Sequence, residues 1–249
     1  MISFLRKIRK NLLVSGNTGK YLKYAIGEIA LVMIGILLAL QVNAWNQERL
    51  EKKETRNILA NLHEEFLENR RQLNSVYETY TKALGSSVAL LHLVGEDPVI
   101  LETQNIDSLL YNSFPTAEFY PSSQSIDNII QSGRLSLIKD QQLIALTYQW
   151  KALLELLNDR EETQDSWINE TTLPFLTKHI SFVEMDGRGR PSWYQPSKLK
   201  KSYGPLFQNL EFENIMENGI YLQDKTIERL KECDQLIDEI IKITQPYAQ

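Results

Sequence analysis

Hydrophobic residues follow two different patterns, one near the N-terminus and one along the remainder of the chain. Residues 24–44 (YAIGEIALVMIGILLALQVNA) are almost wholly apolar, and Glu28 is the one charged residue among them. From Asn46 onwards, apolar residues recur at intervals of three and four between polar ones, which is typical of helices that bury one face. No stretch shows the convincing alternation of a β-strand. The pattern therefore predicts an all-α protein.

The apolar stretch has the length of a membrane span. As a helix, residues 24–44 cover roughly 31 Å, about the thickness of the hydrocarbon core of a bilayer. Tyr21 and Tyr24 precede the span and Trp45 follows it, at depths where aromatic rings favour the headgroup region. A cleaved signal peptide is the alternative, since residues 42–44 (VNA) loosely fit a cleavage site, although the basic region before them is too long for that pattern. We expect a retained transmembrane helix.

Charge differs between the two sides of this span. Six basic residues and no acidic residue precede it: Arg6, Lys7, Arg9, Lys10, Lys20 and Lys23. By the positive-inside rule, residues 1–23 are predicted to be a basic amphipathic segment on the cytoplasmic side, with residues 45–249 outside the cytoplasm. The six basic residues and Glu28 together supply +5, so residues 45–249 hold about −10 in a chain whose formal net charge is −5. An acidic outer domain argues against nucleic acid as a partner.

One stripe of the predicted membrane helix differs from its other faces. It contains Glu28, Gly35, Ala39, Asn43 and Asn46. Small residues let two helix backbones approach closely, and polar side chains form hydrogen bonds across the contact. The stripe predicts a helix–helix interface, for self-association or for docking to a membrane partner. The alternative is that Glu28 lies one turn inside the boundary and extends towards water, beside glycine and alanine that are ordinary in membrane helices.

A long helix is predicted directly after the span, as a stalk over residues 45–94 that ends at the turn sequence Gly95–Pro98. Its apolar residues keep the heptad-like spacing of a coiled coil: Leu59, Leu62, Phe66, Leu73, Val76, Tyr80, Leu84, Val88 and Leu91. The stalk is expected to enter a bundle formed by the rest of the outer domain.

The remaining helices are predicted from their caps and their spacing. Asn105 or Asp107 opens a short helix, and a second begins at Ser122 or Ser123 and ends at Gly133. After Asp140, a second long helix repeats the heptad rhythm through Leu143, Leu146, Trp150, Leu153, Leu157, the polar exception Gln164, and Trp167. Two final helices are expected over residues 208–218 and 220–244, separated at Gly219.

The anchor also resembles a family signature. The matching residues are Lys20-Tyr21, Tyr24 to Ile29, Ile34 to Leu37 and Asn43-x-Trp45-Asn46, which together fit the pattern KYxxYAIGEIxLVxIGILLALQxNxWN. This opening resembles that of a family of uncharacterised single-pass membrane proteins of Gram-negative bacteria, a domain of unknown function. A second similar element, Ser132-Gly133-x-Leu135-x-Leu137-Ile138, lies in mid-chain. The resemblance implies the bacterial inner membrane and a helical domain in the periplasm, and it implies no activity.

Residues 185–205 form the least regular segment, and its charge is opposite to that of the surrounding domain. The segment has five basic residues and one acidic residue. Arg188 and Arg190 beside Trp193 and Tyr194 predict a loop that holds a carboxylate, a phosphate, a sugar or a protein partner. The alternative, which we favour, is a connector whose basic residues balance neighbouring acidic helices and whose rings dock on the bundle.

No set of residues amounts to a catalytic, cofactor or metal site. His63-Glu64-Glu65-Phe66-Leu67 begins like a zinc-protease helix, but it has leucine where the second histidine ligand belongs. Cys233 is the one cysteine, so a disulfide is possible only between chains, and a buried small hydrophobe is the commoner role. We therefore expect no enzyme and no cofactor.

Two functions are the leading hypotheses, and an enzyme of unrecognised type, which requires titratable residues that converge in a cleft of the bundle, is the third. The first is a membrane-anchored interaction or scaffold module, forming a homo-oligomer through anchor and stalk or recruiting a membrane or periplasmic protein. The second is an extracytoplasmic ligand-binding sensory domain, by analogy with other helical bundles outside bacterial membranes. Since one span carries no signal back across the membrane, a sensory domain requires a membrane partner.

Overall fold

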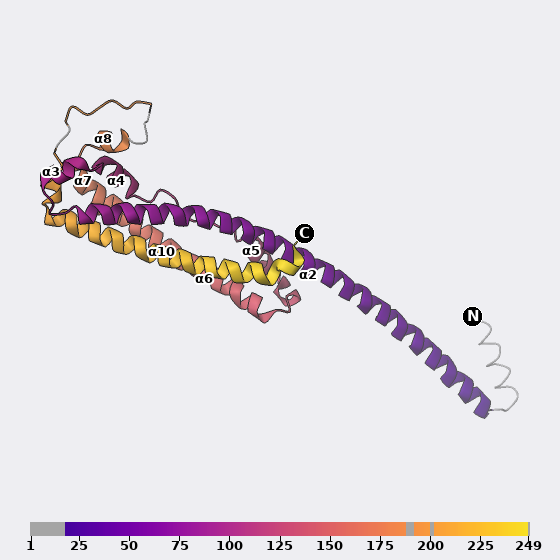
Figure 1. The fold of residues 1–249 in the computed structure, drawn as a ribbon. Coiled ribbons are helices and arrows are strands. Elements are labelled where there is room, and N and C mark those ends of the chain that lie inside the picture. The colour runs from indigo at the N-terminus through magenta and orange to yellow at the C-terminus, as the bar shows by residue number, and fades with distance from the viewer. Residues whose placement is uncertain (1–17, 188–191, 200–201, 249) are drawn as a thin grey trace. The chain divides into compact units, whose positions relative to one another are not determined.

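A computed structural model describes residues 18–187, 192–199 and 202–248, and these residues are mostly helical (Figure 1). Among them there is no strand, which confirms the all-α prediction. Arg188 and Arg190 lie outside the described residues. The chain divides into two compact units, Met1–Arg56 and Asn57–Gln249. In order, the elements are α2 (Thr18–His92), α3 (Pro98–Thr103), α4 (Ile106–Asn112), α5 (Gln124–Gln131), η1 (Arg134–Leu137), α6 (Gln141–Trp167), the π-helical η2 (Ile168–Thr172), α7 (Leu173–His179), α8 (Phe182–Asp186), α9 (Gly204–Phe207), α10 (Leu210–Thr244) and η4 (Gln245–Tyr247).

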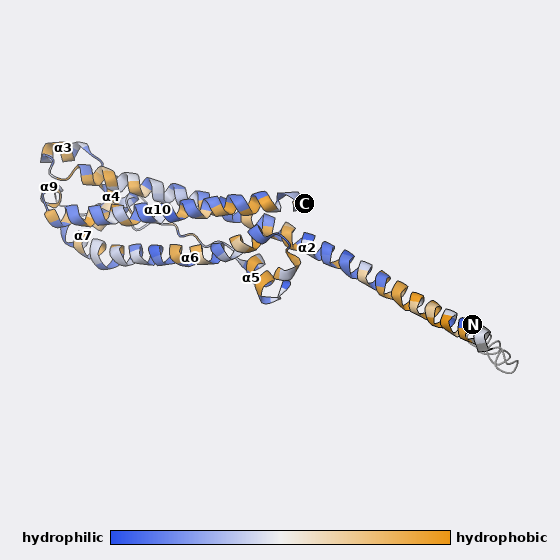
Figure 2. Cartoon of the chain, turned by 90° about the horizontal axis from the view of Figure 1, so that it is seen from below, coloured by the Kyte–Doolittle hydropathy of each residue, from blue (hydrophilic) through white to orange (hydrophobic). Residues whose placement is uncertain are grey.

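In the first unit, α2 carries apolar side chains on all its sides. Every large hydrophobic residue from Leu22 to Val42 is more than half exposed, and Figure 2 shows this stretch as almost continuously hydrophobic. By length and composition, it is the one helix in the described part of the chain that is able to cross a membrane. A core helix of a water-soluble protein would bury much of this surface, whereas none of the most apolar window is buried.

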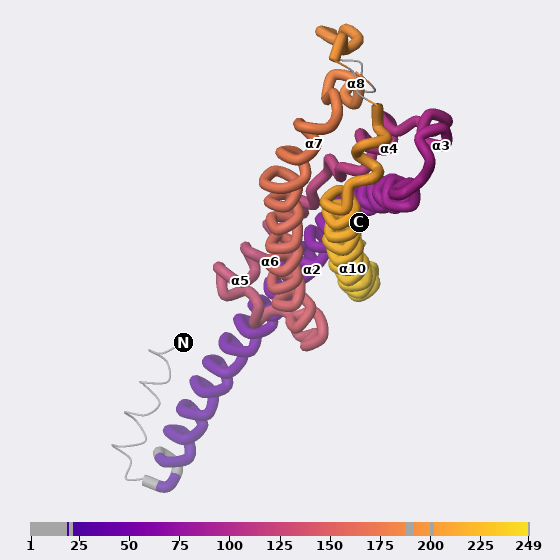
Figure 3. Tube along the Cα trace, turned by 90° about the vertical axis from the view of Figure 1, so that its left-hand side faces the viewer, coloured from indigo at the N-terminus to yellow at the C-terminus, as the bar shows by residue number. Residues whose placement is uncertain are grey.

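In the second unit, three long helices lie side by side: α2 from Asn57 onwards, α6 and α10 (Figures 1 and 3). Phe66 of α2 packs on Trp150 of α6, with ring centroids 5.0 Å apart. The His63 ring of α2 and the Thr244 hydroxyl of α10 share a hydrogen bond of 3.0 Å. Residues of α2 near position 65 thus contact the first half of α6 and the end of α10. This agrees with α6 running parallel to α2 and with α10 running antiparallel to both.

The buried face of α2 keeps alternating steps of three and four residues for its whole length in this unit. It consists of Leu59, Leu62, Phe66, Asn69, Leu73, Val76, Tyr80, Ala83, Ser87 and Leu90. The predicted positions Leu84, Val88 and Leu91 are half-buried flanks of this face, so the prediction was one residue out of phase there. The difference arises because the seven-residue repeat continues through the small or polar residues Ala83 and Ser87, which apolar spacing alone does not reveal.

The predicted caps are largely present. Asn105 accepts a hydrogen bond from the Ser108 amide and Asp140 accepts one from the Leu143 amide, so these two residues begin α4 and α6. Ser123 precedes α5, although its side chain makes no capping bond. Gly133 has a φ of 71°, in the left-handed region that glycine adopts readily, and ends that segment as predicted. Helix α3 was not predicted.

The two final helices are one, because α10 passes through Gly219 without a break. A glycine inside a helix costs about 1 kcal/mol relative to alanine, and burial on both sides offsets this. The preceding turn buries Met216 and the following turn buries Leu222 and Gln223. A Cβ at Gly219 would lie 3.9 Å from the indole nitrogen of Trp167, which is an ordinary van der Waals distance.

Two separate groups of apolar side chains form the interior of the second unit. The first, the heptad core, comes mainly from α2, α6 and α10, with contributions from the α5 region: Leu59, Leu62, Phe66, Leu73, Val76, Tyr80, Phe119, Ile126, Ile129, Ile138, Leu143, Leu146, Trp150, Leu153, Leu157, Ile227, Leu230, Cys233, Leu236, Ile237 and Ile240. The second, the short-helix core, joins the ends of α2 and α10 to the short helices: Leu90, Leu101, Ile106, Leu110, Phe175, Leu176, Ile180, Met185, Leu206, Phe207, Phe212, Ile215 and Met216. The boundary between them is where the candidate site lies.

Candidate functional site

Buried polar side chains occupy the positions between the heptad core and the short-helix core. Ser87 on α2, Gln164 on α6 and Gln223 and Thr226 on α10 lie at inward positions of the long helices. Gln164 is 2% exposed and Gln223 is 4% exposed. We call these four residues, together with the carbonyl group of Ser113, the polar layer.

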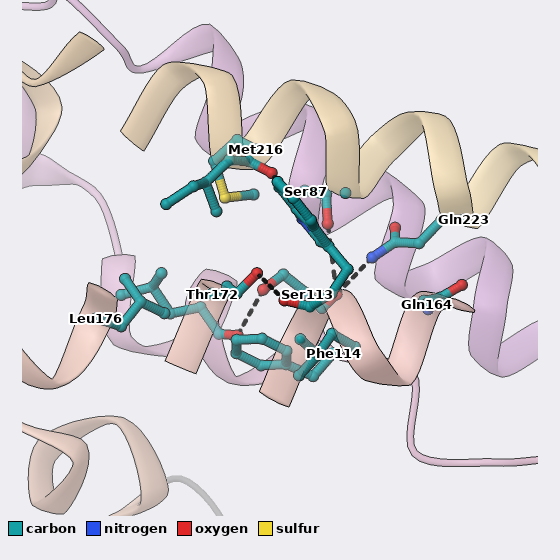
Figure 4. A pocket seen from close by; sticks show the side chains of 13 residues that line it. Ser87, Ser113, Phe114, Gln164, Thr172, Leu176, Met216 and Gln223 are labelled. Carbon is teal, nitrogen blue, oxygen red and sulfur yellow. Dashed lines mark hydrogen bonds between the residues drawn. The ribbon is translucent and has the colours of Figure 1, made fainter. Parts of the chain in front are cut away.

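Hydrogen bonds join the members of the polar layer across the three long helices. The Gln223 side-chain nitrogen donates to the Ser113 carbonyl oxygen at 2.8 Å, and the Ser87 hydroxyl donates to the same oxygen at 3.4 Å (Figure 4). The Thr226 hydroxyl lies 3.2 Å from the side-chain oxygen of Gln164. Because Ser113 directly follows α4, the layer also fixes the chain that leaves this short helix.

A small cavity of about 30 Å³ adjoins the polar layer. Its walls include Ser87, Ser113, Gln164 and Gln223 on the polar side, and Trp167, Leu176 and Met216 among the apolar residues. Two of these residues also have a buried side-chain atom without a hydrogen-bond partner within the protein, namely Nε2 of Gln164 and Oε1 of Gln223. A space of this size holds a water molecule, whereas ligand sites for small organic molecules occupy roughly 300 Å³ or more.

The same cavity touches the π-helical turn η2, through Ile168 and Thr172. Within this turn the Thr172 hydroxyl donates to the carbonyl oxygen of Trp167 at 3.3 Å. The Trp167 indole nitrogen in turn donates to the Ile215 carbonyl oxygen at 3.4 Å, which joins the end of α6 to α10. π-Helical turns are rare and are often found at functional sites, so the irregularity and the polar layer point to the same part of the bundle.

Glu161 is a second buried polar group, one turn before Gln164 on α6. It is 8% exposed, and its Oε1 atom accepts a hydrogen bond of 3.3 Å from the Phe119 amide. Burial raises the pKa of Glu161 to about 7, while the Phe119 hydrogen bond lowers that pKa and the carboxylates of Glu118 and Asp165 raise it further. Glu161 therefore titrates near neutral pH.

A wider, open depression of about 360 Å³ lies on the solvent side of Glu161, lined by acidic residues that include Glu118, Glu162, Asp165 and Glu170. Among the described residues, no group of three or more histidine, cysteine, aspartate or glutamate side chains is arranged to hold a metal ion.

Cys233 is buried, and burial raises the pKa of its thiol to about 12, so the thiol stays protonated near neutral pH.

The predicted membrane stripe lies on α2 in the first unit. Gly35, Ala39, Asn43 and Asn46 are exposed, and Glu28 is half-buried. A Cβ at Gly35 would meet no atom within 4 Å, so space is available on this face for another helix. These residues do not approach each other more closely than their helical spacing requires, and their role as an interface stays a prediction.

Of the predicted loop residues, Trp193 and Tyr194 are in the described part of the chain. Trp193 is 65% exposed and lines no part of the cavity beside the polar layer. The ring of Tyr194 lies against Gly187, leaving no room for a Cβ there. Elsewhere in this segment, the Tyr203 hydroxyl donates to the Asp107 carboxylate. Both tyrosines thus contact protein groups, and the role of this segment stays a prediction.

Sequence reasoning identified one member of the polar layer and missed three. Gln164 stood out as a polar exception in a heptad, whereas Ser87, Gln223 and Thr226 were not singled out. The available signal was position: each of the three continues a repeat of three and four residues set by its apolar neighbours. Polar residues at such positions are buried whenever the helix keeps its phase.

Comparison with known proteins supplies a family. Neither a curated protein nor a solved structure matches the chain. The family match begins at Glu28, inside the anchor, and continues through α6 and η2 into α7. It includes the mid-chain element at Gly133 and the anchor residues from Glu28 onwards, whereas Lys20 to Gly27 of the anchor signature lie before it. Through residues 28–178, the chain belongs to a family of unknown function, DUF6090.

Proposed function

We propose that this protein is a membrane-anchored helical interaction or scaffold module. The observation that carries the proposal is the contrast along α2, which exposes apolar side chains on every side from Leu22 to Val42 and buries a single face after Asn57. Lipid would cover the apolar side chains from Leu22 to Val42, whereas the apolar face after Asn57 is already buried within the protein. The same helix, α2, thus provides both the proposed membrane anchor and one of the long helices of the bundle.

Retention of the anchor is supported by the course of α2. Cleavage after Ala44 would fall inside a helix that continues to His92. The six basic residues before the span support an N-terminus on the cytoplasmic side of the bacterial inner membrane. The bundle then lies on the periplasmic side. Mass spectrometry of the protein extracted from its own membranes tests this directly: we expect a mass that includes residues 1–44, and a mass that begins at Trp45 would exclude the anchor.

The stripe of Glu28, Gly35, Ala39, Asn43 and Asn46 is the contact surface that we propose for a membrane partner or for a second copy of the chain. Its small residues allow close approach of a second helix, and its polar residues supply hydrogen bonds. The acidic surface of the bundle makes protein a more suitable partner than nucleic acid.

We also propose that the protein has no catalytic role. His63 is buried and hydrogen-bonded to Thr244, and the ring of His179 stacks on Phe175 at 4.3 Å between centroids. The thiol of Cys233 lies in the heptad core. These three side chains are therefore engaged in packing rather than directed into a cleft.

The sensory alternative has less support. The cavity beside the polar layer is too small for an organic ligand, and Trp193 is exposed rather than part of that cavity. A ligand bound by the bundle would restore this alternative, and isothermal titration against small carboxylates, phosphates and sugars is the direct test.

The scaffold proposal is tested by affinity purification of the intact protein from its own membranes in mild detergent. Three variants are compared with the parent: Glu28→Leu, Ala39→Leu on the stripe, and Ala30→Leu. Ala30 lies nearly opposite Ala39 on a helix of ~3.6 residues per turn, so it receives the same substitution on the other face. We expect a specific protein, or a second copy, to co-purify with the parent and with Ala30→Leu, and to be lost with the two stripe variants.

Two results would contradict the proposal. If crosslinking in native membranes finds the monomer alone and nothing co-purifies with the parent, there is no partner to scaffold. If Ala30→Leu disrupts the complex as strongly as Ala39→Leu does, the stripe is not the contact surface.

A further inference from the structure

Residues 114–122 form an irregular segment between α4 and α5, which we call the strap. In the described part of the chain, the strap forms no hydrogen bond with another backbone group. Side chains of the long helices hold it instead. Asn69 on α2 donates to the Ser122 carbonyl oxygen at 2.8 Å and accepts from the Ser122 amide at 2.9 Å. Glu161 on α6 accepts from the Phe119 amide at 3.3 Å. The strap therefore connects α2 to α6.

These two attachments respond differently to pH. Asn69 is fully buried and carries no ionisable group, so its pair of hydrogen bonds with Ser122 is the same at every pH near neutrality. The attachment at Phe119 depends on a carboxyl group. It also fixes an apolar side chain, since Phe119 is 4% exposed and its ring centroid lies 6.3 Å from that of Trp150. A change at this carboxyl group therefore acts on the heptad core.

The groups that face Glu161 do not compensate a negative charge. Glu118 on the strap and Asp165 on α6 both raise its pKa. From α2 and α10 it faces Tyr80 and Cys233, whose own pKa values are raised, so both are neutral near pH 7. Among the described residues that line the acidic depression, none is basic. The other carboxyl groups of this lining are those of Glu118, Glu162, Asp165 and Glu170.

The charged form of Glu161 is disfavoured while the strap is attached. Its pKa is raised to about 7 because burial outweighs the Phe119 hydrogen bond, which favours the charged form. Detachment would remove the strap backbone from the carboxyl oxygen and carry Glu118 away, so that water hydrates the carboxylate. A rise in pH through 7 therefore favours the detached strap, and a fall in pH favours the attached strap.

We propose that the strap is a pH-dependent switch, which stays on the bundle while Glu161 is protonated and detaches around Phe119 when that carboxyl group ionises. Asn69 keeps the Ser122 end in place, so the movement is confined to the residues before it. Detachment exposes the Phe119 ring and the part of Trp150 that it covers. The switch is independent of the proposed scaffold function and does not require a partner.

Hydrogen exchange of the intact protein in mild detergent, at pH 6 and pH 8, tests the switch. Rates are corrected for the intrinsic effect of pH on exchange. If detachment returns the pKa of Glu161 to its ordinary value of 4.5, the ratio of detached to attached strap rises roughly ten-fold between these pH values. We expect peptides that cover residues 114–122 to lose protection by that factor.

Two neighbouring substitutions show whether Glu161 is the responsible group. In Glu161→Gln, an amide oxygen still accepts from the Phe119 amide but never becomes charged, so the strap should keep its protection at pH 8. Glu162→Gln is the matched control: Glu162 is exposed in the same depression, and its variant should retain the ten-fold change. A pH dependence in Glu161→Gln that equals that of the parent would overturn the proposal.

Exchange in low concentrations of urea separates detachment of the strap from unfolding of the whole bundle. Local opening exposes little surface, so exchange of the strap at pH 8 should change little with urea, whereas exchange of α10 around Ile237 should rise steeply. If both rise equally steeply, the strap detaches only when the bundle unfolds, and there is no switch.

Discussion

The heptad core and the short-helix core are equally well buried but are assembled in different ways. The heptad core draws most of its residues from three long helices, at steps of three and four along each helix. The short-helix core gathers its residues from the ends of α2 and α10 and from helices as short as α9 (Gly204–Phe207). A long helix specifies its own buried face, whereas a helix of one turn acquires a buried face only from what it packs against.

The polar layer between the two cores adds to this contrast. Apolar contact is continuous within each core, but at their boundary the helices are joined through hydrogen bonds of Ser113, Gln164, Gln223 and Thr226. Proteins open locally in cooperative units that often coincide with supersecondary motifs. We therefore expect the two cores to respond separately to mutations, and the following predictions test that expectation.

The largest effect is expected in the heptad core, for Trp150→Ala. Trp150 is fully buried and packs on Phe66 and Phe119, with ring centroids 5.0 and 6.3 Å away. Its truncation should cost towards the upper end of ~3–5 kcal/mol, because both the ring's burial and its aromatic contacts are lost. Thermal unfolding of the intact protein in mild detergent, followed by circular dichroism, should show the whole bundle melting at a lower temperature.

The matched control is Tyr148→Ala, two residues away on the same helix at an exposed position. It should change stability by about 0.5 kcal/mol or less. If the two variants melt alike, Trp150 does not contribute to the core as its burial indicates.

A smaller and more local effect is expected in the short-helix core, for Phe212→Ala. The Phe212 ring lies 5.2 Å from that of Phe207 and 6.3 Å from that of Phe175, so it connects α10 to α9 and α7. We expect a loss of about 3 kcal/mol. In hydrogen exchange followed by mass spectrometry, peptides of α4, α7 and α9 should lose protection, while those around Trp150 keep theirs.

Leu210→Ala is the control, since Leu210 begins the same helix and is exposed. It should leave exchange unchanged throughout the bundle. Loss of protection that spreads equally to both cores in Phe212→Ala would mean that the polar layer does not separate them.

The sequence predicts these two cores to different degrees. Apolar spacing correctly indicated Leu59 to Tyr80 on α2 and Leu143 to Leu157 on α6, because a periodic pattern on a long helix needs no knowledge of partners. It did not predict α3, and it placed a break at Gly219, because a local propensity gives no information about burial on both sides of a residue. Tertiary packing overrides such propensities.

The candidate site was predicted less well than the fold, for a related reason. Gln164 is conspicuous because its neighbours at heptad spacing are apolar, but Ser113 takes part through its backbone carbonyl, which no side-chain pattern reveals. The cavity is also lined by the π-helical turn η2, and the composition of the sequence gives no signal for such a turn.

The smallest effect, and the one that depends on pH, is expected at Glu161 on α6, beside Phe119 of the heptad core. Its pKa is raised to about 7 by burial, and it faces Tyr80, Cys233, Glu118 and Asp165. The pKa in the folded protein lies above the ordinary value of 4.5. The protonated carboxyl therefore contributes stability that is fully present below about pH 4.5 and is lost as the pH rises through 7. The loss is at most about 3 kcal/mol.

We expect the melting temperature of the parent to fall between pH 5 and pH 8, and that of Glu161→Gln to change much less over the same range. A glutamine keeps an oxygen that accepts the Phe119 amide hydrogen bond but never acquires charge, so at pH 8 the variant should be the more stable protein. The neighbouring Glu162 is exposed, and Glu162→Gln should retain the pH dependence of the parent. If Glu161→Gln and Glu162→Gln show the same pH dependence, the buried carboxyl of Glu161 is not the group that titrates, and the heptad core is insensitive to pH.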